Sequence, residues 1–600
     1  MSRHSINDLN AAVNGLTAPK RFLDLVAALG SSTAVRTMTD AGDWQQWSYD
    51  EVLDRAARAA TGLRERGVQP GDRVLMMMRN RPDFHWFDIA LQFLRATSVS
   101  IYNSSSVEEI AYLGSHAGAR VAIIESGAFL DRVLAARGQL PELESIFVVG
   151  DTPTDGGTVE AADTLLDNEP ADMGALAAAT APKDIATMIY TSGTTGPPKA
   201  VMINQYNVVF TVESLRLAMD SPEHNPMRSI SYLPMAHIAE RMVGLYMPMV
   251  LGVNVATCPE IGELSTYLTA VRPQMMFGVP RVWEKIYNSV NAALAADPDK
   301  LRQFNEAVDA ALVIKQAERD GTITEEQRQT WDFLDAVAFA QVRQLIGLDE
   351  MQLAISGAAP IQQRVLEWFC AIGVPFTEVY GLSETSGPLT WTATDNRPGW
   401  VGPAIPGVEI RLGDDGEVLG RGGVIFQGYF NDQAKTDEAL VNGWFHTGDI
   451  GEISDDGYLR IVDRKKELII TSGGKNISPG NLEAALRGID LIGQAAVIGD
   501  NRKYLSALLV LDPEAAKLWA SRHGVDVAAM ADDPRVIAEV QAGVDRINTQ
   551  FAKVEQIKKF TLLADEWQPD SEVLTPTSKL KRRGINAVYA EQIEAMYVGA

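Results

Sequence analysis

A loop rich in glycine and small hydroxyl side chains, closed by a lysine, is the segment whose residue types point most directly to chemistry. Residues 191–199 read Thr-Ser-Gly-Thr-Thr-Gly-Pro-Pro-Lys. Glycine lets a backbone approach a ligand closely, and hydroxyls, free amides and the lysine ammonium donate hydrogen bonds. These properties predict a loop that holds phosphate oxygens, although such clusters also form ordinary loops. The spacing differs from the G-x-x-x-x-G-K-[ST] pattern of P-loop NTPases.

Two later segments combine groups suited to the rest of a nucleotide. Residues 380–387 read Tyr-Gly-Leu-Ser-Glu-Thr-Ser-Gly. The ring could stack on a purine, the carboxylate could hold Mg²⁺ and a hydroxyl could bind phosphate, but a strand-end turn with a capping Glu384 would look the same. Residues 444–450 place Asp449 directly after a glycine. There it could accept hydrogen bonds from ribose hydroxyls, or stand in an ordinary turn.

A histidine and a basic run complete the candidate chemistry. His237 follows a short apolar run, where a lone histidine is most often a hydrogen-bonded packing residue. Residues 574–583 read Leu-Thr-Pro-Thr-Ser-Lys-Leu-Lys-Arg-Arg, which could face an anionic substrate or form a solvated surface. The sequence has no zinc-type His/Cys spacing, no G-x-S-x-G and no G-x-G-x-x-G after a strand, so nothing favours a hydrolase or a dehydrogenase.

Alternating strands and helices must position these groups in the first two thirds of the chain. Continuous apolar runs predict buried strands at Val74–Met78, Val121–Ile124 and Ile146–Val149. Helical spacing predicts helices at Asp83–Arg95 and Ser106–His116. Strands that alternate with helices indicate parallel α/β layers. A further strand, Ala186–Tyr190, leads into the loop at 191–199, and ligands usually lie at such strand ends.

The remaining segments differ in character. Residues 300–345 are charged and helically periodic, which predicts a helical insertion on the surface, with a partner-binding helix as the alternative. Beyond residue 400, Gly-Asp turns between short apolar runs predict a small, mostly antiparallel β subdomain. Asp463-Arg-Lys-Lys466, followed by Ser-Gly-Gly-Lys at 472–475, is a candidate hinge. An apolar run at 374–379 predicts the strand that leads to Tyr380.

The tail returns to α/β alternation. We expect a helix at Leu482–Leu486, strands at Ala495–Ile498 and Leu505–Leu511, and one long helical stretch from Ala515 to Phe551.

Composition narrows the class of protein. The chain has 600 residues, which is too long for one core, and its net charge of −25 argues against a general nucleic-acid binder. Two cysteines exclude a disulfide framework and fit a reducing cytosol. The N-terminus lacks the apolar core of a signal peptide, and the longest apolar run, Met242–Val253, is too short to span a bilayer. We therefore expect a cytoplasmic protein, with peripheral membrane contact left open.

The order of the motifs resembles the adenylate-forming enzyme superfamily, which includes acyl-CoA synthetases, nonribosomal adenylation domains and firefly luciferase. Six motifs carry the resemblance over essentially the whole chain: residues 191–199, Tyr-Leu-Pro-Met-Ala-His at 232–237, Tyr-Gly-Leu-Ser-Glu at 380–384, Trp-Phe-His-Thr-Gly-Asp at 444–449, Asp-Arg-Lys-Lys-Glu at 463–467 and Thr-Ser-Lys-Leu-Lys-Arg at 577–582. Val-Pro-Arg-Val-Trp-Glu-Lys-Ile at 279–286, with the helical insertion after it, resembles the long-chain fatty acyl-CoA synthetase branch.

The resemblance implies a layered α/β fold in two domains. Residues 1–462 would form a large adenylation domain of mostly parallel α/β subdomains plus a small β subdomain. Residues 463–600 would form a smaller, mobile α+β domain that rotates between two half-reactions, with Asp463 at the hinge. The implied reaction activates a long-chain fatty acid with ATP and Mg²⁺, and then transfers the acyl group to coenzyme A. The oligomeric state, monomer or homodimer, is left open.

The resemblance also implies a role for each matching residue. The grip on the ATP β- and γ-phosphates would come from Thr191, Ser192, Gly193, Thr194, Thr195, Gly196 and Lys199. Gly357, Ala358 and Ala359 would line the adenine, Tyr380 would pack on its face, and Ser383 would touch the α-phosphate. Gly381 would belong to the same nucleotide-binding site. Glu384 would ligate Mg²⁺, and Asp449 with Arg464 would hold the ribose. Lys579 would bridge the substrate carboxylate and the α-phosphate, and His237 would position the substrate and gate the carboxylate.

Departures from the family pattern are few. Ala200 stands where glycine is usual, Gln205 where histidine is frequent, and Ser578 where many relatives have glycine. Two alternatives remain open. A fatty acyl-AMP ligase would pass the acyl group to a separate carrier protein. A non-catalytic nucleotide-binding scaffold is disfavoured because Lys199, Glu384, Asp449 and Lys579 are all present.

Overall fold

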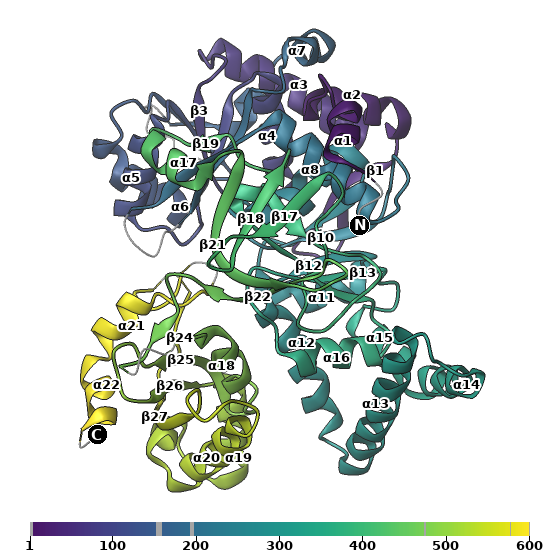
Figure 1. Ribbon diagram of the computed structural model, residues 1–600. Helices are drawn as coiled ribbons and strands as arrows, with labels where there is room; N and C mark the ends of the chain where they lie inside the picture. The colour runs from purple at the N-terminus through teal and green to yellow at the C-terminus, as the bar shows by residue number, and fades with distance from the viewer. Residues whose placement is uncertain are drawn as a thin grey trace.

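The chain folds into a large N-terminal part and a separate C-terminal part (Figure 1). The computed structural model describes residues 4–151, 159–191, 197–472, 476–569, 571–575 and 578–598. The largest cluster of buried apolar residues takes its members from between Leu9 and Leu459, and a second cluster takes its members from between Ile469 and Ile557. The predicted two-part α/β architecture is therefore confirmed.

An eight-stranded sheet forms the layer that leads into the phosphate-type loop. Its strand order is β19-β9-β8-β4-β3-β5-β6-β7, and every pair from β8 to β7 is parallel, whereas β9 pairs antiparallel with both β8 and β19. The strands are β3 (Arg73–Met77), β4 (Thr97–Ser100), β5 (Val121–Glu125), β6 (Ser145–Val149), β7 (Val159–Ala161), β8 (Ile185–Thr191), β9 (Lys199–Asn204) and β19 (Gly428–Tyr429). Since β3, β5, β6 and β8 are largely buried, the runs predicted as buried strands are confirmed.

Helices pack around this sheet. Those of the first third are α1 (Ile6–Ala12), α2 (Ala18–Leu29), α3 (Tyr49–Glu65), α4 (Pro82–Phe93), α5 (Val107–Ala117), α6 (Ala128–Ala136), η1 (Arg137–Gln139), η2 (Ala162–Leu165), α7 (Met173–Ala179) and α8 (Gln205–Ala218). The helices predicted around α4 and α5 are confirmed. A capping box fixes the start of α5, because the Ser106 side chain and the third helical residue, Glu109, satisfy each other's backbone amides.

Two further sheets carry the histidine motif and the segment before Tyr380. One has the order β10-β11-β1-β2 and the other is parallel, in the order β12-β13-β14. Their strands are β1 (Thr33–Met38), β2 (Trp44–Ser48), β10 (Arg228–Ser231), β11 (Asn254–Thr257), β12 (Met275–Gly278), β13 (Leu353–Ser356) and β14 (Phe376–Glu378). A continuous helical run follows the histidine motif: α9 (Ile238–Arg241), the π-helical turn η3 (Met242–Tyr246) and α10 (Met247–Leu251).

The helical insertion extends away from the sheets (Figure 1). After η4 (Ile261–Glu263) and α11 (Leu264–Val271), the helices are α12 (Pro280–Leu294), α13 (Pro298–Arg319), α14 (Glu325–Leu334), the π-helical turn η5 (Asp335–Phe339), α15 (Ala340–Ile346) and α16 (Gln363–Ala371). The predicted helical character of residues 300–345 is confirmed. One face of α13 is buried through Phe304, Val308, Ala311 and Ile314, so the insertion is anchored to the large part.

An antiparallel sheet closes the large part, as the turn-rich sequence beyond residue 400 predicts. Its order is β17-β18-β21-β20, and β22 pairs with β21. The strands are β17 (Val408–Leu412), β18 (Glu417–Gly422), β20 (Leu440–Val441), β21 (Trp444–Ile453) and β22 (Leu459–Arg464), with α17 (Gln433–Ala439) between β19 and β20. A hairpin of β15 (Tyr380–Leu382) and β16 (Gly387–Thr390), with η6 (Ser383–Thr385) at its tip, lies beside it.

The C-terminal part is an α+β unit around the three-stranded sheet β25-β26-β27. Its elements are β23 (Ile469–Ile470), β24 (Asn476–Ile477), α18 (Pro479–Leu486), β25 (Ile492–Ile498), β26 (Leu505–Leu511), α19 (Pro513–His523), η7 (Val527–Asp532), α20 (Pro534–Asn548), β27 (Ile557–Leu563), α21 (Arg582–Val588) and α22 (Ala590–Tyr597). The predicted boundary at 462/463 falls within β22 and stays a prediction.

The long helical stretch predicted from Ala515 to Phe551 is mostly helical, but it is not continuous. The structure has two helices there, α19 and α20, separated by the 3₁₀ turn η7. Gly524 caps α19 in the left-handed conformation, which ends an α-helix, and Pro534 opens α20 at its first position, where proline is tolerated. Both breaking residues stand in the sequence, but the apolar periodicity runs through them and concealed the break.

Candidate active site

One cavity of about 930 Å³ is lined by most of the predicted site residues that the structure describes. Charged and hydroxyl side chains line part of its wall, including Thr191, Lys199, Glu384, Arg464 and Lys579. Apolar side chains line another part: Leu215, Met219, Ile238, Met242, Val243, Met247, Met275, Phe277, Ile355, Val379 and Trp391. The cavity therefore combines a surface suited to anions with a surface suited to a hydrocarbon chain.

The phosphate-type loop connects two paired strands at the wall of this cavity. Thr191 ends β8, Lys199 begins β9, and the two residues are cross-strand neighbours. Residues Ser192, Gly193, Thr194, Thr195 and Gly196 lie outside the described residues. Thr191 and Lys199 both line the cavity, so the two residues that flank this segment lie at the cavity wall.

Glu384 lies at the tip of the β15–β16 hairpin and is held on two sides. Its carboxylate Oε1 accepts a hydrogen bond from the Tyr429 hydroxyl at 2.8 Å, and its backbone oxygen accepts one from the Phe426 amide at 2.9 Å. The ammonium of Lys199 lies 4.8 Å from the centroid of the Tyr429 ring. The cation and the carboxylate expected at the phosphates thus flank one tyrosine.

Some of the residues predicted to bind the adenine, the ribose and the α-phosphate line the cavity, and others do not. Ala358, Gly381, Ser383 and Arg464 line the cavity, whereas Gly357, Ala359, Tyr380 and Asp449 are not among its lining residues. The hairpin requires glycine at 381, because an added Cβ would meet the Gly387 carbonyl oxygen at 1.8 Å.

The two carboxylate oxygens of Asp449 have different partners, a tyrosine hydroxyl and an arginine guanidinium. The Tyr380 hydroxyl donates to its Oδ2 at 2.5 Å, and Arg464 Nε lies 3.2 Å from its Oδ1. Cross-strand pairing of Asp449 with Arg464 between β21 and β22 places these two partners together. Burial raises the pKa of the Asp449 carboxyl, and the Arg464 charge and the Tyr380 hydroxyl oppose that rise. Asp449 and Arg464, each predicted from a separate motif to hold the ribose, are thus in direct contact.

Lys579 reaches the cavity from the C-terminal part. The Lys579 amide donates to Thr575 Oγ1 at 3.0 Å, and a bridge between Leu574 and Leu580 closes the turn. Lys579 is exposed and lines the cavity. Desolvation lowers the pKa of the Lys579 ammonium to about 8, with Arg464 adding to the effect against the charges of Asp449, Glu467 and Glu384.

The basic run around Lys579 has mixed roles. Arg582 forms a bidentate pair with Glu483 of α18, at 2.8 and 3.0 Å, which anchors the lysine turn to the C-terminal sheet layer. Lys581 donates to the Ser571 carbonyl at 2.9 Å, although it also lines the cavity. Lys579 is therefore placed to face an anionic ligand, as one interpretation of this run predicts, whereas Arg582 has a structural role.

His237 caps α9 and faces the same cavity. Its Nδ1 accepts a hydrogen bond from the Ala239 amide at 3.2 Å, so the neutral ring carries its proton on Nε2. Burial lowers the pKa of His237 to about 3, and the Lys579 charge adds to this effect. His237 is therefore more than a packing residue, because its neutral ring lines the cavity and can donate a hydrogen bond there.

Comparisons with known proteins agree with this arrangement. The family model described as AMP-binding enzyme matches residues 25–430, and that described as AMP-binding enzyme C-terminal domain matches residues 466–600. The chain belongs to the AMP-binding enzyme family.

Two relatives named as long-chain-fatty-acid–CoA ligases are similar to the chain over most of its length. The chain is 35% identical over 562 residues to the long-chain-fatty-acid–CoA ligase FadD15 of Mycobacterium tuberculosis, covering 93% of each protein. It is 30% identical over 630 residues to the long-chain-fatty-acid–CoA ligase ACSBG2 of Xenopus laevis, covering 98% of this chain and 85% of that one. Among solved structures, the adenylation domain of a carboxylate reductase from Mycobacterium chelonae matches with a TM-score of 0.74 and 20% identity, over 99% of this chain and 93% of that one, which supports the fold.

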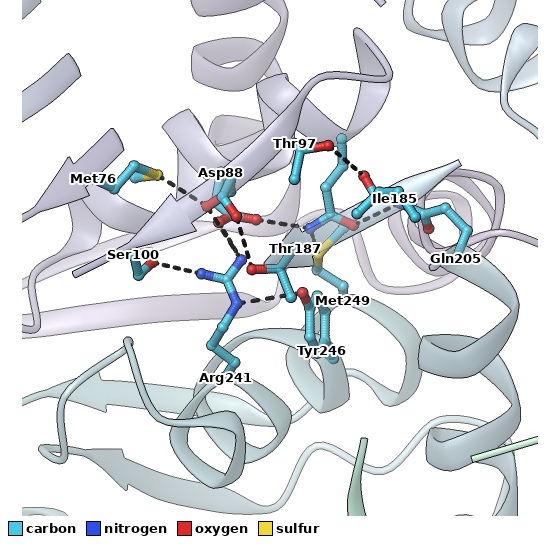
Figure 2. A network of polar contacts seen from close by, with 12 residues as sticks. Met76, Asp88, Thr97, Ser100, Ile185, Thr187, Gln205, Arg241, Tyr246 and Met249 are labelled. Atoms are coloured by element: carbon cyan, nitrogen blue, oxygen red, sulfur yellow. Dashed lines mark hydrogen bonds and ion pairs between the residues drawn. The ribbon is translucent and has the colours of Figure 1, made fainter. Parts of the chain in front are cut away.

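In this AMP-binding enzyme a buried polar network joins α9, the helix that starts after His237, to α4, β4 and β8 (Figure 2). Arg241, on α9, pairs with Asp88 of α4, and both side chains are completely buried. The guanidinium also donates to Ser100 on β4 at 2.8 Å and to the Tyr246 hydroxyl at 3.3 Å. Thr187 joins the network from β8, the strand that ends at Thr191. The ion pair thus ties α9, the helix that starts after His237, to α4, and the hydrogen bond to Ser100 ties it to β4.

Sequence reasoning missed several supporting residues of this AMP-binding enzyme. Asn80 donates to the Leu233 carbonyl at 2.9 Å, and Glu240 accepts from the Leu233 amide at 3.1 Å, so both hold the loop that carries His237. Burial raises the pKa of Glu240 to about 7. The signal available was charge in apolar company at Asp88, Glu240 and Arg241, because buried charges are rare unless they are paired.

Proposed function

We propose that this chain is an AMP-forming long-chain fatty acid–CoA ligase. It would join a fatty acid to ATP with release of pyrophosphate, and then transfer the acyl group from the adenylate to coenzyme A with release of AMP. The observation that carries the proposal is one cavity whose lining combines Lys579 and His237 with side chains suited to anions and with apolar side chains. Relatives that cover over nine tenths of the chain bear the name of this activity.

The first half-reaction must bring two anions together. The fatty carboxylate attacks the α-phosphorus of ATP, the P–O bond to pyrophosphate breaks, and a mixed anhydride forms. Lys579, reaching into the cavity, would neutralise the repulsion between the carboxylate and the α-phosphate. Lys199 would neutralise the leaving pyrophosphate, and His237 would donate its Nε2–H to a carboxylate oxygen.

A magnesium ion fits the carboxylate present. Within the described ranges no cluster of three or more His, Cys, Asp or Glu side chains could hold a metal by itself. Mg²⁺ is commonly bound by one or two carboxylates together with substrate phosphates, which fits Glu384 beside Lys199. When bound there, Mg²⁺ would neutralise phosphate charge.

The second half-reaction requires a thiol to reach the acyl carbon that Lys579 has just faced. Lys579 belongs to the C-terminal part, so movement of that part would withdraw the lysine and open the cavity to coenzyme A. The apolar wall would keep the hydrocarbon chain in place meanwhile. We place the hinge near Asp463, where β22 leads out of the antiparallel sheet.

The test is a panel of straight-chain acids from two to about twenty carbons together with aromatic acids, assayed with ATP and with or without coenzyme A. We expect AMP and acyl-CoA to form together with the longer acids. Accumulation of acyl-adenylate despite coenzyme A would instead favour an acyl-AMP ligase that serves a carrier protein. Absence of ATP consumption with every acid would overturn the proposal.

The same assay tests Lys579. In Lys579→Ala we expect adenylate formation to fall at least 100-fold, because electrostatic stabilisation of this kind is commonly worth two to three orders of magnitude. Thioester formation from supplied acyl-adenylate should be largely retained. Equal loss in both half-reactions would contradict the role assigned to this lysine.

None of the helices in the described ranges combines the length and the apolar character needed to cross a bilayer. We propose a cytoplasmic location, and membrane contact and oligomeric state do not enter the proposed mechanism.

A further inference from the structure

We propose that Tyr429 is a positioning residue that keeps Lys199 and Glu384 apart and ready for their ligands. The inference rests on the proposed function for the identity of those ligands, a nucleoside triphosphate and a divalent cation. It adds a residue to which neither the motifs nor the proposed mechanism gives a role.

Tyr429 contacts both charged groups through different parts of its side chain. Its hydroxyl donates to Glu384 Oε1 at 2.8 Å, and its ring face lies 4.8 Å from the Lys199 ammonium. In the part of the chain that the structure describes, Lys199 and Glu384 form no ion pair with each other. The tyrosine therefore stands between two opposite charges that line one cavity.

The surrounding structure fixes this tyrosine in place. Tyr429 lies on β19 in register with Val201 of β9, two residues after Lys199. Its amide donates to Thr436 Oγ1 at 2.9 Å, its ring packs edge-on against Phe426 with centroids 4.8 Å apart, and only 8% of the residue is exposed. The backbone, the ring and the hydroxyl of Tyr429 are therefore each held by a separate contact.

Separation of the two charges matters before the nucleotide arrives. An ammonium and a carboxylate that share a partly dehydrated cavity attract each other strongly, and a direct pair would occupy the Lys199 charge that the phosphates need. A cation–π contact is weaker than such a pair, so a phosphate can take the lysine from the ring. The ring thus holds Lys199 without neutralising it.

The hydroxyl has a separate effect on Glu384. It occupies Oε1, and no side chain or backbone group among the described residues hydrogen-bonds to Oε2, so one oxygen is oriented while the other is available to a cation. Hydrogen bonds that orient a metal-binding carboxylate in this way typically strengthen metal binding 10- to 100-fold.

Three variants separate these effects. Tyr429→Phe keeps the ring and removes only the hydroxyl, whereas Tyr429→Leu removes both. Tyr458→Phe is the matched control, because the Tyr458 hydroxyl also donates to a carboxylate, Asp395 Oδ2 at 2.5 Å, in a residue that is 7% exposed and does not line the cavity.

The first measurement is Mn²⁺ binding in the presence of α,β-methylene-ATP, followed by electron paramagnetic resonance. We expect Tyr429→Phe to weaken Mn²⁺ binding about 10-fold and to leave metal-free binding of the analogue, measured by calorimetry, within about 2-fold. Tyr458→Phe should change neither quantity. Unchanged Mn²⁺ affinity in Tyr429→Phe would overturn the role of the hydroxyl.

The second measurement tests the ring through metal-free binding of the analogue. We expect Tyr429→Leu to weaken it about 5-fold or more, since Lys199 can then pair with Glu384. Adding Glu384→Gln should restore binding in the Tyr429→Leu background by a larger factor than it improves binding in the unaltered chain. Equal effects of Glu384→Gln in the two backgrounds would overturn the separating role.

The two proposals fail separately. Loss of acyl-CoA formation in the unaltered chain would count against the proposed function. The readouts for Tyr429 are nucleotide and cation binding, and they do not depend on which acid is activated.

Discussion

At the scale of single residues, desolvation lowers the pKa of both His237 and Lys579, and the two resulting charge states suit different tasks. His237 is neutral over the whole physiological range because its pKa is about 3, whereas Lys579 has a pKa of about 8. At neutral pH the site therefore holds a neutral donor and a mostly charged ammonium. The pH dependence of adenylation should consequently report the lysine.

We predict that kcat/KM for adenylation falls above about pH 8, by a factor that approaches ten per pH unit. The sign follows from the depressed pKa of Lys579: the required ammonium is present below that pKa and is lost as pH rises through it. Because kcat/KM reports the free enzyme, pyrophosphate exchange measured from pH 6 to 10 is the test. Lys579→Arg keeps its charge, so its alkaline decline should disappear even if its plateau is lower. An unchanged decline in Lys579→Arg would assign the titration to another group.

The sequence predicted the residues that act on the ligand better than those that support them. Lys199, Glu384 and Lys579 are recognisable from local motifs, and all three line the cavity. Asn80, Glu240 and Tyr429 act through partners that are distant in the sequence, apart from the Glu240 contact with Leu233. Contacts between residues that are distant in the sequence depend on tertiary packing, so no local sequence pattern predicts them.

At the scale of helices and strands, the Asp88–Arg241 pair joins α4 to α9 in the interior (Figure 2). We predict that Arg241→Met destabilises the large part by about 3–5 kcal/mol, because it leaves the Asp88 charge buried without a partner. The double variant Asp88→Asn, Arg241→Met should lose clearly less. Urea unfolding monitored by intrinsic fluorescence measures both, and a double variant as unstable as Arg241→Met would show that the cost is one of packing rather than of charge.

Element prediction succeeded where burial leaves a simple pattern. Parallel strands such as β5 and β6 are covered on both faces, so they read as unbroken apolar runs. The pattern failed at α19 and α20, where the same periodicity continues across Gly524 and Pro534. The π-helical turn η3 was also invisible, since it depends on one shifted hydrogen-bond register rather than on composition.

At the scale of the whole molecule, few contacts hold the C-terminal part against the large part. Arg281 donates to the Gly493 carbonyl at 3.2 Å, and Gln362 donates to the Arg487 carbonyl at 3.1 Å. Three ion pairs add to these contacts: Arg281–Asp512, Lys285–Glu514 and Arg364–Asp490, at 3.6, 3.7 and 3.5 Å. Ion pairs of half-exposed or exposed side chains are each worth about 0–1 kcal/mol, so the arrangement can be left and regained in each cycle.

We predict that neutralising the cations of these pairs, in Arg281→Gln, Lys285→Gln, Arg364→Gln, slows adenylation about 2- to 10-fold. The arrangement that places Lys579 in the cavity would be less populated, whereas thioester formation from supplied adenylate would be unchanged or faster. Single-turnover assays of each half-reaction provide the measurement, with high salt expected to reproduce the effect in the unaltered chain. An equal slowing of both half-reactions would contradict the prediction.

The wall of the cavity is shared between the two parts, because Lys579, Leu580 and Lys581 come from one and the remaining charged groups mostly from the other. This has a pharmacological consequence. A compound that contacts both surfaces at once would hold the two parts together and stop the enzyme between its half-reactions. It would not need to resemble either product. Its potency would depend on how long the two surfaces stay together, so weakening the ion pairs between them should confer resistance without any change in the residues that it touches.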